Sequence, residues 1–155
     1  MNFTPAPILL VEDNEDDAIL VKIAFEQAGI ECSWQTAEDG QEAILYLSGE
    51  GKYEDRSKYP MPLVVLVDLT LPRKSGHEVL AWMQRRKELL SVVRVVLTGS
   101  ENPEDVDTSY ALGAQGYLLK PITKEQLQQP GRTLRTILLV NGSSPSPSPT
   151  VVAVG

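Results

Sequence analysis

Four dense apolar runs divide the chain, and each ends at a polar residue. The runs cover 8–11, 63–67, 92–97 and 116–119, and the polar residues that follow are Glu12 with Asp13, Asp68, Thr98 and Lys120. Runs this rich in leucine and valine predict strands that are buried on both faces, as in a parallel sheet. Because the carboxyl ends of parallel strands meet at one edge, we expect these five polar groups to lie where open α/β sheets build their sites.

The segment after the first strand predicts a helix over 14–28 that ends at Gly29. We expect its core-facing stripe to consist of Leu20, Ala24, Phe25 and Ala28. Ile19 and Ile23 lie four residues apart on another line of the helix, so they belong either to the core or to an interface.

Capping sequences predict the remaining helices. Asp39, Ser75 and Thr123 are each followed three residues later by Glu or Gln, and Asn102 precedes a proline. A short strand over 31–36 completes the pattern. The resulting alternation of strands and helices predicts an α/β fold with a parallel sheet, helices on both faces and right-handed crossovers.

Three segments depart from this alternation. Residues 48–62, with two glycines and two prolines, predict a long exposed loop, which is either a tolerated insertion or an interaction element. Pro130 falls inside the last predicted helix, where proline costs about 3 kcal/mol, so a kink or a break is expected. Residues 1–140 are predicted to form one domain, and 141–155, rich in serine and proline, a disordered tail.

Charge and composition narrow the function. The formal net charge of -7 argues against non-specific nucleic-acid binding, which needs a basic surface. The single cysteine, Cys32, allows no internal disulfide and is expected to be a buried thiol in a reducing compartment. No stretch approaches the ~20 apolar residues of a membrane span, and 1–7 is not a signal peptide. We therefore expect a cytoplasmic protein with no membrane or nucleic-acid partner.

The polar groups at the predicted sheet edge indicate phosphoryl chemistry. Glu12, Asp13 and Asp68 would repel one another unless a cation neutralised them, and oxygen ligands of this kind suit Mg²⁺. Lys120 and Thr98 supply a positive charge and a hydrogen-bond donor, which the oxygens of a phosphoryl group require. Asp68, on the central strand, is the best-placed nucleophile for forming an acyl phosphate.

Four motifs resemble the receiver domains of two-component response regulators, in order and at the right spacing over residues 8 to about 128. They are Val11-Glu12-Asp13-Asn14, Val67-Asp68-Leu69-Thr70-Leu71-Pro72 followed by Gly76, Leu97-Thr98, and Tyr117-Leu118-Leu119-Lys120-Pro121. The loop at 49–62 and the lack of an output domain are most similar to the small regulators that partner bacterial phytochrome kinases.

The resemblance implies a flavodoxin-like fold with strand order 2-1-3-4-5 and a signalling protein rather than an enzyme. It implies that Asp68 accepts a phosphoryl group from a sensor histidine kinase, and that the protein then switches its binding to an unknown downstream protein. Mg²⁺ would be held by Glu12, Asp13, Asp68 and the main-chain carbonyl of Thr70. Thr98 and Lys120 would bind phosphoryl oxygens, Thr98 and Tyr117 would act as the switch pair, and the Lys120-Pro121 bond would often be cis. A homodimer is an assembly that the resemblance allows.

Two residues depart from the family pattern, and two other functions compete with the receiver. Thr70 stands where the close relatives usually carry Asn, and Pro130 interrupts the last helix. A pseudo-receiver scaffold that is never phosphorylated would not need the intact set of Glu12, Asp13, Asp68, Thr98 and Lys120. An aspartyl-nucleophile phosphatase would need a second Asp at the position of Thr70. His77, the only histidine, is expected to lie exposed in the first turn of its helix, without a catalytic role.

Overall fold

A five-stranded parallel sheet forms the centre of the computed structural model, which describes residues 5–128. Its strands are β1 (Ala6–Val11), β2 (Cys32–Ala37), β3 (Val64–Asp68), β4 (Val93–Thr98) and β5 (Gly116–Leu119). They lie in the order β2-β1-β3-β4-β5, as expected. β3 is therefore central, with β1 and β4 as its hydrogen-bonded neighbours.

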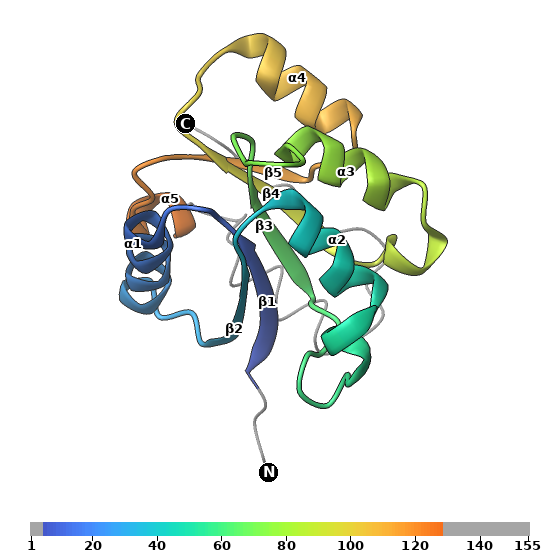
Figure 1. Cartoon of the computed structure of the whole chain (residues 1–155). Helices are drawn as coiled ribbons and strands as arrows, with labels where there is room; N and C mark the ends of the chain where they lie inside the picture. Colours follow the sequence, from blue (N-terminus) through green and yellow to red (C-terminus); the bar gives the residue numbers. More distant parts are fainter. Residues whose placement is uncertain (1–4, 129–155) are drawn as a thin grey trace.

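The helices cover both faces of the sheet (Figure 1). α1 (Glu15–Gln27) and α5 (Lys124–Leu127) lie on one face, and α2 (Gly40–Ser48), α3 (Gly76–Gln84) and α4 (Pro103–Ala111) lie on the other. Two short 3₁₀ turns, η1 (Gly51–Glu54) and η2 (Lys87–Leu89), complete the described elements. No helix within residues 5–128 is both long enough and apolar enough to cross a membrane.

The two faces of the sheet have separate cores because successive strand residues point in opposite directions. On β4, Val93, Val95 and Leu97 pack against the α1 face, whereas Val96 packs on the side of α2 to α4. All four side chains are fully buried. The continuous apolar runs in the sequence follow from this burial on both faces.

The predicted caps form at the helix starts. Asp39 accepts a hydrogen bond from the Glu42 N–H at 2.7 Å, and Ser75, Asn102 and Thr123 make the corresponding bonds at α3, α4 and α5. Asn14, which was not predicted as a cap, does the same at α1. The Glu42 carboxylate accepts a hydrogen bond from the Tyr53 hydroxyl. These bonds satisfy backbone donors that the first turn leaves free.

The predicted core stripe of α1 is wrong at Leu20. Val21, Ala24, Phe25 and Ala28 are buried, whereas 51% of Leu20 is exposed. Val21 continues the spacing of three and four residues that the other three set, so the sheet-facing line passes through it and Leu20 lies on the flank. Ile19 and Ile23 are 53% and 42% exposed, so they lie outside the core.

The segment over 49–62 is packed more closely than the predicted exposed loop. Tyr53 is buried, with its ring centre 4.9 Å from that of Tyr46 and 5.0 Å from that of Tyr59. The Arg56 guanidinium donates to the carbonyls of Tyr46 and Leu47, at 2.9 and 3.1 Å, near the end of α2. Contacts between these aromatic rings depend on the turns of the loop, so they leave no periodic pattern in the sequence from which they could be predicted.

His77 also differs from expectation. It is half-buried, and its Nε2 lies 3.0 Å from the Ser109 hydroxyl, which joins α3 to α4. Cys32 is half-buried rather than buried, and this burial raises the pKa of its thiol to about 11. Pro130 and the predicted tail lie outside the described residues, as does the end of the predicted domain at residue 140.

Candidate functional site

Three carboxylates meet at the carboxyl ends of the strands. Glu12 and Asp13 follow β1 directly, and Asp68 is the last residue of β3, its hydrogen-bonded neighbour. One carboxylate oxygen from each residue lies within 4.8 Å of the other two. Glu12 and Asp68 are buried and Asp13 is exposed, so the cluster opens to solvent on one side.

Lys120 reaches this cluster from the β5 end of the strand order. It follows β5, which is separated from β3 by β4, and its backbone N–H donates to the carbonyl of Thr98 at 2.8 Å. The Nζ donates to Asp68 Oδ2 at 2.5 Å and to Asp17 Oδ2 at 2.9 Å, and it is also hydrogen-bonded to Glu12. An ammonium has three donors, so all three are used on carboxylates.

Burial and hydrogen bonds together set the pKa values of Glu12 and Lys120. Burial, supported by the nearby charge of Asp68, raises the pKa of Glu12 to about 7, although hydrogen bonds from Lys120 and the Asn14 N–H lower it. Burial alone would lower the pKa of Lys120, but its hydrogen bonds to Asp68, Glu12 and Asp17 raise that pKa above its ordinary value. The lysine therefore stays charged, and the carboxylates around it outnumber it.

The chemistry of these donors fits a divalent cation. Carboxylate oxygens are the ligands that Mg²⁺ and Mn²⁺ take in proteins, and an open side leaves room for the waters that such ions keep. A dication would balance the negative charge that Lys120 leaves uncompensated. The Thr70 main chain, whose carbonyl is the expected metal ligand, also contacts Asp68 directly: its N–H donates to Asp68 Oδ1 at 2.9 Å.

A close backbone approach fixes the loop that follows Asp68, between β3 and α3. The N–H of Gly76, the first residue of α3, donates to the carbonyl of Leu69 at 3.0 Å. A Cβ on Gly76 would lie 2.3 Å from the carbonyl oxygen of Asp68 and 2.7 Å from the Cα of Leu69. Only glycine permits this approach, so Gly76 determines where the start of α3 lies relative to Asp68.

The predicted switch residues lie on β4 and β5. Thr98 ends β4 and is buried, and its hydroxyl oxygen accepts from the Ser100 N–H at 3.2 Å. Tyr117 is also buried, and its hydroxyl donates to the Ser100 carbonyl at 2.8 Å. Ser100 thus connects the two, which the sequence did not indicate.

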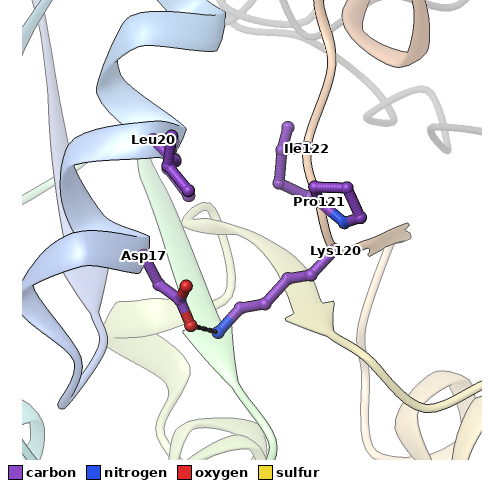
Figure 2. Close-up of a pocket in the computed structure, with 6 residues that line it drawn as sticks. Asp17, Leu20, Lys120, Pro121 and Ile122 are labelled. Carbon is purple, nitrogen blue, oxygen red and sulfur yellow. Dashed lines mark hydrogen bonds and ion pairs between the residues drawn. The ribbon is translucent and has the colours of Figure 1, made fainter.

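Asp17 is the other residue of the site that sequence reasoning missed. It lies in the first turn of α1, where acidic side chains are common because they interact favourably with the helix dipole. Because the helix dipole already explains an acidic residue at this position, the sequence offered no reason to expect its contact with Lys120. A pocket of about 310 Å³ adjoins this ion pair and is lined by Leu20, Val21, Pro121 and Ile122 (Figure 2).

Residues 8–130 match the response regulator receiver domain family. The chain belongs to this family. Receiver domains act in two-component phosphorelays, in which a sensor histidine kinase phosphorylates an aspartate of the receiver. They bind a divalent metal, and they are generally not enzymes.

The relatives of this receiver domain cover most of its length. It is 35% identical to the probable methanogenesis regulatory protein FilR2 of Methanothrix harundinacea, over 93% of this chain and 90% of FilR2. It is 40% identical to the response regulator Rcp1 of Synechocystis, over 75% of this chain and 77% of Rcp1. The Mn²⁺-bound structure of Rcp1 is similar to this one with a TM-score of 0.68, covering 75% of this chain and 81% of that chain.

A phosphorylated structure is also among the similar proteins. The phosphorylated cyanobacterial phytochrome response regulator RcpA shares 34% identity with this chain, with a TM-score of 0.73. The similarity covers 94% of this chain and all of that one. This chain therefore shares its fold with one receiver solved in a phosphorylated form and one solved with a metal bound.

Proposed function

We propose that Asp68 is the phosphoacceptor of this receiver domain and that phosphorylation there switches its binding to a downstream protein. The observation that carries this assignment is the contact between Lys120 Nζ and Asp68 Oδ2 at 2.5 Å, beside a cluster of two further carboxylates. Asp68 lies at the carboxyl end of the central strand, where hydrogen-bond donors can reach both of its carboxylate oxygens. Oδ1 accepts from the Thr70 N–H and Oδ2 from Lys120.

In the proposed reaction, a carboxylate oxygen of Asp68 attacks the phosphorus of a kinase phosphohistidine. The P–N bond breaks, its electron pair stays on the imidazole nitrogen, and an acyl phosphate forms on Asp68. Lys120 and the Thr98 hydroxyl then bind phosphoryl oxygens, because Thr98 ends β4 and Lys120 directly follows β5, its hydrogen-bonded neighbour, so that a neutral and a charged donor lie at the same edge. Hydrolysis by water later returns the carboxylate and releases inorganic phosphate.

We propose Mg²⁺ as the metal, held by Glu12, Asp13, Asp68 and the main-chain carbonyl of Thr70. When bound, it would neutralise the charge that develops on the phosphoryl oxygens. The proximity of the three carboxylates supports this assignment. The family's switch role falls to Thr98 and Tyr117, supported by their common contact with Ser100.

The partner we propose is a phytochrome-type sensor histidine kinase. The support is the similarity to RcpA, which is a phytochrome response regulator, and to the bacteriophytochrome response regulator AtBRR. Ile19, Leu20 and Ile23 of α1 are exposed, and Leu20 lines the pocket next to Lys120, so this helix offers such a kinase an apolar surface near Asp68.

Labelling with acetyl phosphate tests the assignment of Asp68. In the presence of Mg²⁺, the wild-type protein should acquire one acid-stable, hydroxylamine-labile phosphate per chain, and Asp68→Asn should acquire none. Asp16→Asn is the matched control, because this exposed residue undergoes the same change outside the carboxylate cluster. Labelling of Asp68→Asn at the wild-type level would place the phosphate elsewhere, and the absence of any wild-type labelling would favour the pseudo-receiver.

A further inference from the structure

Lys120 has a carboxylate partner outside the metal cluster. Of its three partners, Glu12 and Asp68 belong to the group of acidic residues that can share a cation, whereas Asp17 does not. Asp17 comes from the first turn of α1, and its Oδ2 lies 2.9 Å from the ammonium (Figure 2). This contact crosses from α1 to the segment after β5 and joins two parts of the chain that are 103 residues apart.

The two other partners, Glu12 and Asp68, also have roles of their own in the proposed function. A bound cation would take oxygens of Glu12 and Asp68, and phosphorylation would convert one Asp68 oxygen into part of an acyl phosphate. The cation would compete with the ammonium for these oxygens, and phosphorylation would replace the Asp68 oxygen by phosphoryl oxygens as the acceptor of one of its three donors. Asp17 is the acceptor that neither event consumes.

We propose that Asp17 is a positioning residue for Lys120, and this inference rests on the proposed function of Asp68. In the resting site the ammonium lies 2.5 Å from Asp68 Oδ2, so it occupies an oxygen that the nucleophile needs. Asp17 offers the ammonium an alternative partner when Asp68 attacks. It also keeps Nζ at the edge of the site, where phosphoryl oxygens arrive.

The environment of each group fits this role. The Lys120 side chain is 18% exposed and that of Asp17 is 39% exposed, so the pair lies at the boundary between the buried site and solvent. A charge-assisted hydrogen bond in such a place is stronger than one on an open surface but still easy to exchange. Asp17 can therefore hold the lysine without trapping it.

Replacing Asp17 by Asn tests the proposal, because it removes the charge and keeps the shape. With acetyl phosphate and saturating Mg²⁺, Asp17→Asn should lower the maximal rate constant of Asp68 phosphorylation about fivefold, the effect of losing one charge-assisted contact at a partly exposed site. Asp17→Glu, which restores the carboxylate, should recover most of the rate. The wild-type stoichiometry of one phosphate per chain should be reached in each case.

Asp16→Asn is the control for an effect on α1 alone. Asp16 lies in the same acidic first turn and is exposed, so its replacement changes the net charge and the helix dipole interaction equally. It should leave the rate within twofold of wild type. Thermal unfolding followed by circular dichroism should show similar midpoints for Asp16→Asn and Asp17→Asn.

A double-variant cycle with Lys120→Gln separates positioning from general electrostatics. If Asp17 acts through Lys120, Asp17→Asn should have no further effect in the Lys120→Gln background. A rate for Asp17→Asn equal to or above wild type, an equal loss in Asp16→Asn, or a full additional loss in the double variant would each overturn the proposal. If Asp68→Asn were labelled like wild type, the proposed function itself would fail, and that result is distinct from all three.

Discussion

A single ammonium group balances carboxylates that come from three parts of the chain. The Nζ of Lys120 contacts Glu12 after β1, Asp17 in α1 and Asp68 on β3. Burial raises the pKa of Glu12 to about 7, whereas these contacts raise the pKa of Lys120. The lysine therefore keeps its positive charge at neutral pH. A site with this balance attracts further positive charge, which is why a dication fits it.

Gly76 allows a residue-scale prediction, because its role is purely steric. Gly76→Ala would place a Cβ 2.3 Å from the Asp68 carbonyl oxygen, so the loop must move. We expect a loss of about 1–3 kcal/mol in the free energy of unfolding, the usual range for overpacking, together with slower phosphorylation of Asp68. Urea denaturation measures the first quantity and acetyl phosphate labelling the second.

Gly99→Ala is the matched control for Gly76→Ala. A Cβ on Gly99 would meet no atom within 4 Å, and the backbone there does not have a positive φ. Its stability should stay within about 0.5 kcal/mol of wild type, as for other substitutions without a named mechanism. If the two alanine variants had equal stability, the close approach at Gly76 would not constrain the loop.

At the scale of elements, α1 has a buried face and an outward apolar face. Val21, Ala24 and Phe25 pack on the sheet, and the outward face carries Ile19, Leu20 and Ile23. Exposed apolar residues that cluster on one element often mark an interaction surface. Leu20 of this surface lines the pocket at Lys120, whose ammonium contacts Asp68, so a protein that delivers a phosphoryl group to Asp68 would come close to it.

The double variant Ile19→Glu/Ile23→Glu tests this docking surface. It should slow phosphotransfer from a phosphorylated sensor kinase at least tenfold, because two charges would be buried in the complex, and it should leave acetyl phosphate labelling unchanged. Leu90→Glu, equally exposed but located before β4 at the other end of the strands, is the control. Normal transfer to the double variant from a panel of kinases, phytochrome-type kinases included, would contradict the docking role.

The loop between α2 and β3 provides a second prediction at this scale. Arg56 satisfies the carbonyls of Tyr46 and Leu47 near the end of α2 and that of Tyr59 within the loop. Arg56→Ala would remove this donor from all three carbonyls, although that of Tyr46 keeps the Gly49 N–H at 3.2 Å, so we expect the protein to lose about 1–3 kcal/mol of stability. Lys58→Ala, a change of the same charge at an exposed side chain, should cost less than 0.5 kcal/mol in the same denaturation experiment.

At the scale of the whole molecule, we expect metal binding at the carboxylate cluster to be coupled to folding. Glu12 and Asp13 directly follow β1, whereas Asp68 ends β3 far along the sequence, so the unfolded chain does not present the three carboxylates together. Any ligand that binds only the folded state stabilises it by mass action. The cluster should therefore make the stability of the domain depend on the concentration of Mg²⁺.

Thermal and denaturant unfolding measure this coupling. At 100 times its dissociation constant, Mg²⁺ should raise the free energy of unfolding by about 2.7 kcal/mol. Asp13→Ala should abolish most of this gain, while Asp16→Ala should retain it. An equal gain with NaCl at matched ionic strength would show general screening of the net charge of -7 instead of a specific site.

The sequence by itself determined the strands, the helix starts and five of the polar groups of the site. Strands buried on both faces require continuous apolar runs, so their ends are visible wherever a polar residue interrupts the run. Helix caps depend on side chains within three residues of the helix start, and this made Asp39 and Ser75 predictable. The family resemblance added the strand order, which local patterns do not contain.

Tertiary structure alone decided the contacts between distant segments. Lys120 meets Glu12 across 108 residues and Asp17 across 103, and both contacts depend on the order of strands in the sheet. The exposure of Leu20 depends on which line of α1 faces the sheet, and the burial of Tyr53 on how its loop folds back onto α2. In each case the physical reason is the same: apolar burial fixes which segments meet, and only then do individual side chains acquire partners.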